Sequence, residues 1–342
     1  MKGRLPAACR NQRRSNESPP STGLNIDNFA RDIAWDLHKG KKELISNLRK
    51  DKADLAREIW AKHENALTSY EAVHYLSFEL VSELHQHYWT RIGDTGGDLG
   101  CEVGFLIAGR GSTIAAEILH LVSGGFADGA AARQRTLHEL TVVLELLTTH
   151  CDTDLAERYM DYATIEQFED MQTYQEHAES IGQQPFTDRE YRELEAEYSA
   201  ILERRGQRFR KRNQWAAILF DPLPKDVTFD QLEKKAGVQH FKPFVRNANH
   251  QVHAGPRSAL LNMRHRPHRR EVSIGVGASS FVDFAEVAHL ALRNILHISS
   301  CVHILVDRHT EDVDPDLVVG LKCLERMVGD AGVAMSRSQQ RA

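Results

Sequence analysis

Two long apolar helical stretches constrain the fold of this chain more than any other feature of its sequence. Residues 128–149 have helical spacing and are apolar on nearly every side from Leu137 to Leu147, and residues 281–306 form a second helix of this kind. A helix that is apolar all round must be covered by other elements, so both stretches predict central helices of one core. Nearly every other regular segment is also helical. The sequence therefore predicts an all-α, multi-helix bundle built around these two helices.

The N-terminal third predicts further helices around this pair. Residues 25–50 carry one or two short helical patterns, and residues 51–92 predict a long helix that is broken near Asn65. Residues 102–122 are also helical in pattern, but the glycines at 109–112 predict a capped break between two helices rather than a phosphate-binding loop.

Domain organisation follows from polarity along the chain. Residues 153–212 form a polar helical pair with few core residues, which predicts a helical hairpin insert that protrudes from the bundle. Residues 1–24 are rich in Arg, Ser and Pro and predict a disordered N-terminal tail. We expect one all-helical domain over residues 25–333, including the insert, and a disordered C-terminal tail over 334–342.

Composition limits the compartment and the partners. The formal net charge is -5, so any surface for nucleic acid must be local. The five cysteines are odd in number and form no C-x-x-C pair, which argues for a reducing compartment. No apolar secretory signal is present, and residues 281–306 carry too many polar groups for a bilayer. We expect a cytoplasmic protein without a membrane partner.

The strongest candidate for chemistry is the stretch from Val245 to Gly255. Arg246, Asn249, His250 and His253 occupy positions i, i+3, i+4 and i+7 there, so on a helix they share one face. A cation, an amide and two imidazoles on one stripe can bind an anion and transfer protons. Basic clusters precede and follow this stretch in sequence.

Two other helices carry polar groups that could face this stripe. Arg135 and Glu139 stand one turn apart on the apolar helix 128–149, and they form either a functional pair or an ion pair that fixes helix register. A polar stripe also follows the helix 281–306, through Glu286, His289, Arg293, His297 and Ser300.

The helical hairpin ends in a run of cations at residues 204–212. Four of them are candidate contacts to an RNA backbone: Arg208, Arg210, Lys211 and Arg212. The alternative is a solvated face whose positive charge favours the C-terminus of the helix.

Four segments, taken in order, resemble a bacterial family of unknown function, the one numbered 5677. They are Arg135-Thr-Leu-His-Glu139, Leu155-Ala-Glu-Arg-Tyr159, Asn213-Gln-Trp215 and His253-Ala-Gly255. The resemblance covers roughly residues 70–306 and implies no established activity. The long basic hairpin and the glycine-rich end of the last motif depart from the family pattern.

Arg246-Asn247 followed by His253 also resembles the R-(x4-6)-H motif of the HEPN domains. These domains are all-helical and often dimeric, and many are metal-independent ribonucleases of toxin or antiviral systems. The resemblance implies that His253 acts on the RNA 2′-hydroxyl, that Arg246 binds the phosphate, and that Asn247 and His250 orient them.

The same resemblance implies RNA as substrate, a homodimer, and no metal or other cofactor. Arg135 and Glu139 would then support the catalytic pair from the neighbouring helix. The spacing alone is not specific in a chain with 18 histidines, because it also occurs at Arg57/His63 and Arg133/His138.

Two alternatives remain open at this level. One is a di-metal carboxylate bundle, whose ligands would be Glu71, His74, Glu117, Glu139, Glu286 and His289. The other is a non-catalytic sensor or interaction protein, in which the His/Arg/Glu cluster is a buried polar network that sets packing.

Overall fold

The computed structural model confirms the all-α prediction. It describes residues 26–93, 96–252, 255–257, 263–266, 269–272, 281–310 and 314–340. Over these residues the regular elements are helices, apart from one short antiparallel hairpin, β1 (Met263–Arg266) and β2 (Arg269–Val272). The predicted N-terminal tail and His253 lie outside the described residues.

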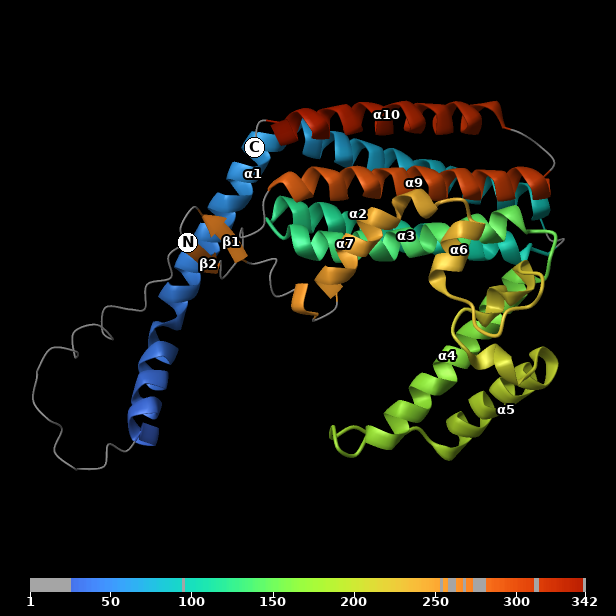
Figure 1. Cartoon of the computed structure of the whole chain (residues 1–342), viewed down its shortest axis with the longest axis horizontal. Coiled ribbons are helices and arrows are strands. Elements are labelled where there is room, and N and C mark those ends of the chain that lie inside the picture. Colours follow the sequence, from blue (N-terminus) through green and yellow to red (C-terminus); the bar gives the residue numbers. More distant parts are fainter. Residues whose placement is uncertain are drawn as a thin grey trace, which may run out of the picture.

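The two predicted central helices lie at the centre of the bundle. They are α3 (Ala127–Thr149) and α9 (Phe281–Thr310), which pack against each other and against α2 (Leu99–Ser123) (Figure 1). Leu137, Leu144 and Leu146 of α3 are fully buried, as the apolar pattern predicts.

A second layer consists of α1 (Ile26–Ile92) and α10 (Pro315–Gln340), which pack against each other and against α9. The helix α1 kinks at His63, two residues from the predicted break at Asn65. Two predictions were wrong here. Residues 26–50 belong to the one long helix α1, and α10 continues to Gln340 because apolar residues near its end are buried in the core.

The helix α2 runs without interruption through Gly109 and Gly111, so the predicted break between two helices was wrong. Packing explains the glycines better. A Cβ atom at Gly111 would lie 3.0 Å from Ile298 Cδ1, and one at Gly104 would lie 3.0 Å from Leu305 Cδ1. The absence of these side chains lets α9 approach α2 closely.

The polar segment forms a helical hairpin, as predicted. Its helices are α4 (Leu155–His177) and α5 (Asp188–Arg205), and the pair projects from the bundle (Figure 1). Thr187 and Glu190 begin α5 with a reciprocal capping box.

The chain returns to the bundle through short elements. They are η3 (Gln207–Arg210), η4 (Gln214–Leu219), α6 (Phe229–Lys235), η5 (Gln239–Phe241) and α7 (Lys242–Val252). Both α6 and α7 pack against α3. The helix expected from about Val238 starts instead at Lys242, after the turn η5.

Two helices are long and apolar enough to cross a membrane by length and composition: α2 and residues 284–310 of α9. Central helices of soluble bundles share this property, and two thirds of the apolar window of α9 (67%) is buried by its neighbours.

Candidate functional site

A pocket opens where α3, α9 and the segment from α6 to η5 meet. Its volume is about 500 Å³, which is in the range of small-molecule sites. Its polar groups come from all three elements: Glu145 from α3, Arg293, His297 and Cys301 from α9, and His240 from η5.

The polar centre of this pocket is the pair Glu145 and His297. The Nε2 atom of His297 lies 2.6 Å from Oε2 of Glu145, and the hydroxyl of Thr149 donates to Oε1 at 2.9 Å. The hydrogen bond from His297 holds the pKa of Glu145 at about 2, well below its ordinary value of 4.5. Glu145 is therefore an ionised carboxylate that orients the imidazole.

Cys301 stands one turn after His297 on α9 and completes a cluster with this pair. Its thiol lies 3.4 Å from Oε2 of Glu145, and the residue is 1% exposed. Burial, and then the negative charge of Glu145, raise the pKa of this thiol far above its ordinary value. Cys301 is thus a neutral hydrogen-bond donor in the protein alone.

The opening of the pocket is cationic and aromatic. Arg293 stands one turn before His297 and is exposed, with its guanidinium 5.2 Å from the ring centre of Phe241. The exposed His240 packs its ring against Phe241 at 4.1 Å. An arginine held over an aromatic ring is well placed to receive an anion. The pocket can therefore bind a negative group and exchange protons with it.

The same cluster offers ligands for a metal ion. One donor atom each from Glu145, His297 and Cys301 lie within 4.8 Å of one another. Carboxylate, imidazole and thiolate together suit Zn²⁺ or a similar ion, and the pocket leaves room for a fourth ligand.

A second cluster of possible metal ligands, Asp98, Cys101 and His309, has a structural role. The Oδ1 atom of Asp98 accepts a hydrogen bond from the Cys101 amide at 2.9 Å, so it caps the N-terminus of α2, and it also lies 3.2 Å from His309 Nε2.

A buried hydrogen-bonded pair lies behind the pocket. His138 of α3 and Glu233 of α6 are joined at 2.9 Å, and their side chains are 1% and 2% exposed. Phe241, which lines the pocket, packs edge-on against His138 at 5.8 Å. The pair therefore fixes α6 and η5 to the central helix, and with them one wall of the pocket.

The described part of the stripe predicted on 245–255 lies on α7, which begins directly after the pocket residue Phe241. Arg246 and Asn247 are exposed, and His250 is half-buried, while His253 lies outside the described residues. The helix α7 packs against α3, which carries Arg135 and Glu139. Arg135 and Glu139 form an ion pair of 3.0 Å within α3, with side chains 20% and 33% exposed.

The predicted RNA contacts lie at the end of the hairpin, in and after η3. Arg208, Arg210 and Arg212 are exposed, whereas Lys211 pairs with Asp226 at 2.6 Å. Three guanidinium groups therefore stay accessible to an anion.

The structure does not gather the six residues of the di-metal alternative. His74 bonds to Ser112, and Glu117 pairs with Arg133. Glu139 pairs with Arg135, as described above. Among the described residues, the metal-ligating groups that do lie close together are the two clusters described above, around Glu145 and around Asp98. The E-x-x-H pattern therefore does not bring these ligands to one site, because His74, Glu117 and Glu139 contact other residues.

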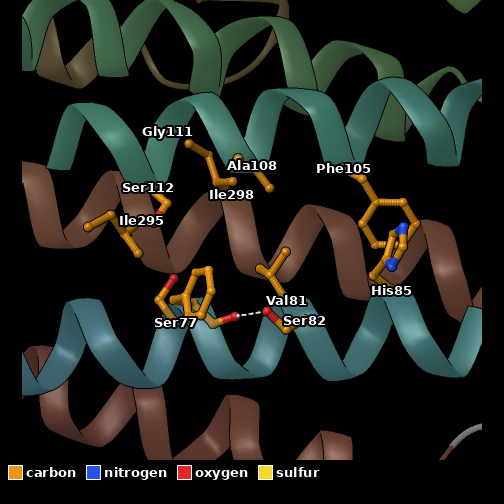
Figure 2. Close-up of a pocket in the computed structure, with 12 residues that line it drawn as sticks. Ser77, Val81, Ser82, His85, Phe105, Ala108, Gly111, Ser112, Ile295 and Ile298 are labelled. Atoms are coloured by element: carbon orange, nitrogen blue, oxygen red, sulfur yellow. Dashed lines mark hydrogen bonds between the residues drawn. The ribbon is translucent and has the colours of Figure 1, made fainter. Parts of the chain in front are cut away.

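A second cavity of about 260 Å³ lies between α1, α2 and α9 (Figure 2). Val81, Phe105 and Ile298 line it together with the small residues Ser77 and Gly111. None of its lining side chains is a carboxylate, lysine or arginine. Its chemistry suits an apolar group rather than an anion.

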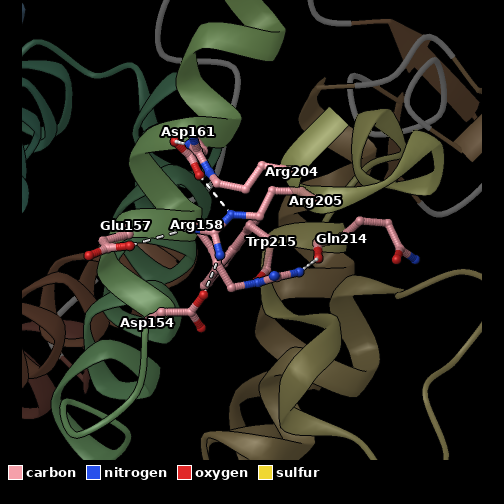
Figure 3. A network of polar contacts seen from close by, with 8 residues as sticks. All are labelled: Asp154, Glu157, Arg158, Asp161, Arg204, Arg205, Gln214 and Trp215. Carbon is pink, nitrogen blue, oxygen red and sulfur yellow. Dashed lines mark hydrogen bonds and ion pairs between the residues drawn. The ribbon is translucent and has the colours of Figure 1, made fainter. Parts of the chain in front are cut away.

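A network at the base of the hairpin joins two of the motif segments that carry the family resemblance. Arg158 donates to the carbonyl oxygens of Trp215 at 2.8 Å and Gln214 at 3.2 Å (Figure 3). Arg205 bonds to Asp161 at 2.8 Å in the same network. These motif residues therefore hold the hairpin to the returning chain.

Sequence reasoning missed Glu145, His240 and Cys301. A signal existed for the first, since Glu145 is a charged residue in the helix predicted to be apolar almost all round. His297 was recognised within a polar stripe, but its partner lies 152 positions away in the chain. Such a pairing follows from the packing of α3 on α9.

Comparison with known proteins agrees with the motif resemblance. Residues 102–269 match the model of a family described as a family of unknown function (DUF5677). The match runs from α2 to β2 and ends before α9, so it includes Glu145 but not His297 or Cys301. No curated protein and no solved structure matches the chain.

Proposed function

We propose that this protein is a metal-independent endoribonuclease whose reaction takes place in the pocket between α3 and α9. The observation that carries the proposal is the bond of 2.6 Å between His297 and Glu145 inside a pocket that also contains an arginine. A histidine held by an ionised carboxylate is the usual form of a general acid or base.

RNA suits this chemistry because it contains its own nucleophile. Removing the proton of a 2′-hydroxyl lets that oxygen attack the adjacent phosphorus, which breaks the bond to the 5′-oxygen and leaves a 2′,3′-cyclic phosphate. In this scheme His297 takes the proton, and His240 at the same pocket gives one to the leaving oxygen. Arg293 stabilises the negative charge of the phosphate.

The HEPN-like pair Arg246 and His253 is the second location for the same reaction. Arg246 is accessible and lies little more than one helical turn beyond Phe241 at the pocket. Asn247 and His250 would orient that pair, and Arg135 and Glu139 would support it from α3. Arg208, Arg210 and Arg212 supply contacts to the RNA backbone in either case. We place the protein in the cytoplasm, where RNA is its substrate.

The test is cleavage of a labelled, unstructured RNA in excess EDTA. We expect cleavage to products that end in a 2′,3′-cyclic phosphate. His297→Ala should lower the rate at least ~100-fold. The matched control is His177→Ala, on the exposed hairpin.

Comparison with a second pair of variants locates the reaction. If Arg246→Ala and His253→Ala abolish cleavage while His297→Ala has no effect, the chemistry belongs to α7. If the purified, folded wild-type protein does not cleave RNA at all, the ribonuclease proposal is wrong.

A second candidate is metal-ion binding by Glu145, His297 and Cys301, which the approach of their donor atoms favours. A bound Zn²⁺ would replace the proton of the Cys301 thiol and the hydrogen bond between the other two residues. Elemental analysis decides between the candidates. Near-stoichiometric metal that is lost in Cys301→Ser supports this site, and cleavage in EDTA by metal-free protein excludes a need for it.

A further inference from the structure

The N-terminal part of α1 is a helical arm that leaves the bundle. Every residue from 26 to 53 is exposed, and burial begins only near Leu55 and Ile59. The end of α10 marks the edge of the bundle, because Ser338 bonds to His63 at the kink of α1. Beyond that edge the arm leaves the bundle of α2, α3, α9 and α10 (Figure 1). At 1.5 Å per residue, residues 26–53 extend about 40 Å.

The arm carries an apolar stripe that has no cover from the described part of the chain. Its residues recur at intervals of eleven along one face, in the two series Ile26, Leu37, Leu48, Ile59 and Ile33, Leu44, Leu55. Eleven residues make about three helical turns, so the residues of each series lie close to one line along the helix. Ile59 is buried in the bundle core, whereas Ile26 and Leu48 are 75% and 43% exposed. The stripe that packs in the core thus continues outward along the arm.

Trp35 differs from the other large apolar residues of the arm in its position on the helix. Trp35 lies on the opposite face, where His38 stacks on it and Lys39 Nζ lies 5.1 Å from its ring centre. The arm itself therefore covers Trp35 in part. A stripe of this length exposed to water is typical of a helix that pairs with another helix.

Charges along the arm point to the identity of the partner. Residues 26–37 contain three aspartates and one arginine, a net charge of -2 (+1 − 3). Residues 39–52 contain six Lys or Arg and two acidic residues, a net charge of +4 (+6 − 2). Two arms in parallel would place like charges together. Two arms in antiparallel orientation would place each acidic segment against the basic segment of the other copy.

We propose that two copies of this chain associate by antiparallel pairing of these arms. In one register the apolar stripes of the two arms face each other and opposite charges are paired. This register places Leu37 of one copy opposite Gly40 of the other. Gly40 has open space around it, which gives room for the leucine. The same register makes these pairs: Ile33 with Leu44, Phe29 with Leu48, Asp36 with Lys41, and Asp27 with Lys50.

Sedimentation equilibrium of the full chain tests the association. We expect a dimer for the wild type and at least a ~10-fold weaker association for the double variant Ile33→Asp/Leu44→Asp. The control Trp35→Asp makes the same kind of change on the other face and should leave the dimer intact. A monomeric wild type at concentrations well above micromolar, or a dimer that the double variant leaves unchanged, would overturn the proposal.

Cysteine cross-linking tests the orientation, in a background with Cys9 and Cys323 changed to Ser. Antiparallel arms predict a disulfide between Phe29→Cys protein and Leu48→Cys protein when the two are mixed, because the register places these residues opposite each other. The two copies of residue 29 would then lie about 28 Å apart along the arms, so cross-linking of Phe29→Cys protein to itself would indicate parallel arms and contradict the register. Neither result depends on ribonuclease activity, so failure here leaves the proposed function untouched.

Discussion

Glu145 gains its properties from the groups that surround it between α3 and α9. It is ionised because His297, Thr149 and Cys301 all bond to it, and these bonds outweigh the cost of partial burial. Its pKa of about 2 in the folded protein lies below the ordinary 4.5, so the folded state binds this proton less tightly than the unfolded state does. Its contribution to stability is therefore full above pH 4.5 and is lost as the pH falls toward 2.

The first prediction compares wild type with Glu145→Gln. On acidification through this window, the free energy of unfolding should fall about 1–3 kcal/mol further in wild type than in the variant. Urea unfolding followed by circular dichroism, above and within the window, measures the difference. Equal acid sensitivity of the two proteins would mean that Glu145 is not held in its ionised form.

The second prediction concerns the buried pair His138 and Glu233. Glu233→Leu leaves the imidazole buried without its carboxylate and should lower the free energy of unfolding by about 3 kcal/mol. The double variant His138→Leu/Glu233→Leu should recover most of that loss, because two apolar groups replace the polar pair. Chemical denaturation measures both. A double variant as unstable as the single one would contradict this role.

The helices could be predicted where the hydrophobic periodicity of the sequence defines them. They were predicted less well where their bounds depend on packing against other helices. The burial of α3 and α9 follows from their apolar surface, and the hairpin α4–α5 follows from its polarity. The glycines of α2 led to the wrong prediction of a break. A glycine that ends a helix and a glycine that lets a neighbouring helix pack closely cannot be told apart in sequence. The end of α10 was predicted too early, since its last buried residues depend on contact with α1.

The third prediction belongs to the hairpin. Arg158→Ala removes two hydrogen bonds to the carbonyl oxygens of Gln214 and Trp215, and a contact with the ring of Phe209. The free energy of unfolding should fall by about 2–3 kcal/mol, and amide exchange should rise at the base of the hairpin. Arg192→Ala, on the exposed face of α5, is the control and should change neither quantity. Equal exchange in the two variants would show that the network does not hold the hairpin.

At the scale of the whole molecule, the candidate site is a product of tertiary structure. Sequence reasoning could find the stripe with Arg293 and His297, because helical spacing defines a face. It could not find that this face meets Glu145 and the turn η5, because that meeting depends on how α6 and α7 return to α3 after the hairpin. The apolar stripe of the arm, in contrast, is fully visible in sequence, and the structure adds that the bundle leaves it uncovered.

The fourth prediction separates the arm from the bundle. Removal of residues 26–52 from a chain that begins at residue 26 should leave the thermal midpoint of the monomer within a few degrees, because residues 26–53 bury no core surface. Thermal melts at concentrations where both proteins are monomeric make the comparison. A large fall in the midpoint would show that the arm folds back on the bundle.

The most direct measurement for the central claim is a histidine-ring NMR titration with a 3′-mononucleotide, the hydrolysed and stable form of the 2′,3′-cyclic end that the proposed reaction leaves. If the pocket between α3 and α9 is the site, the ring resonances of His297 and His240 shift on binding, and Arg293→Ala weakens that binding at least ~10-fold. If the ring of His253 shifts instead while those two stay unchanged, the site includes His253 and the assignment to the pocket is wrong.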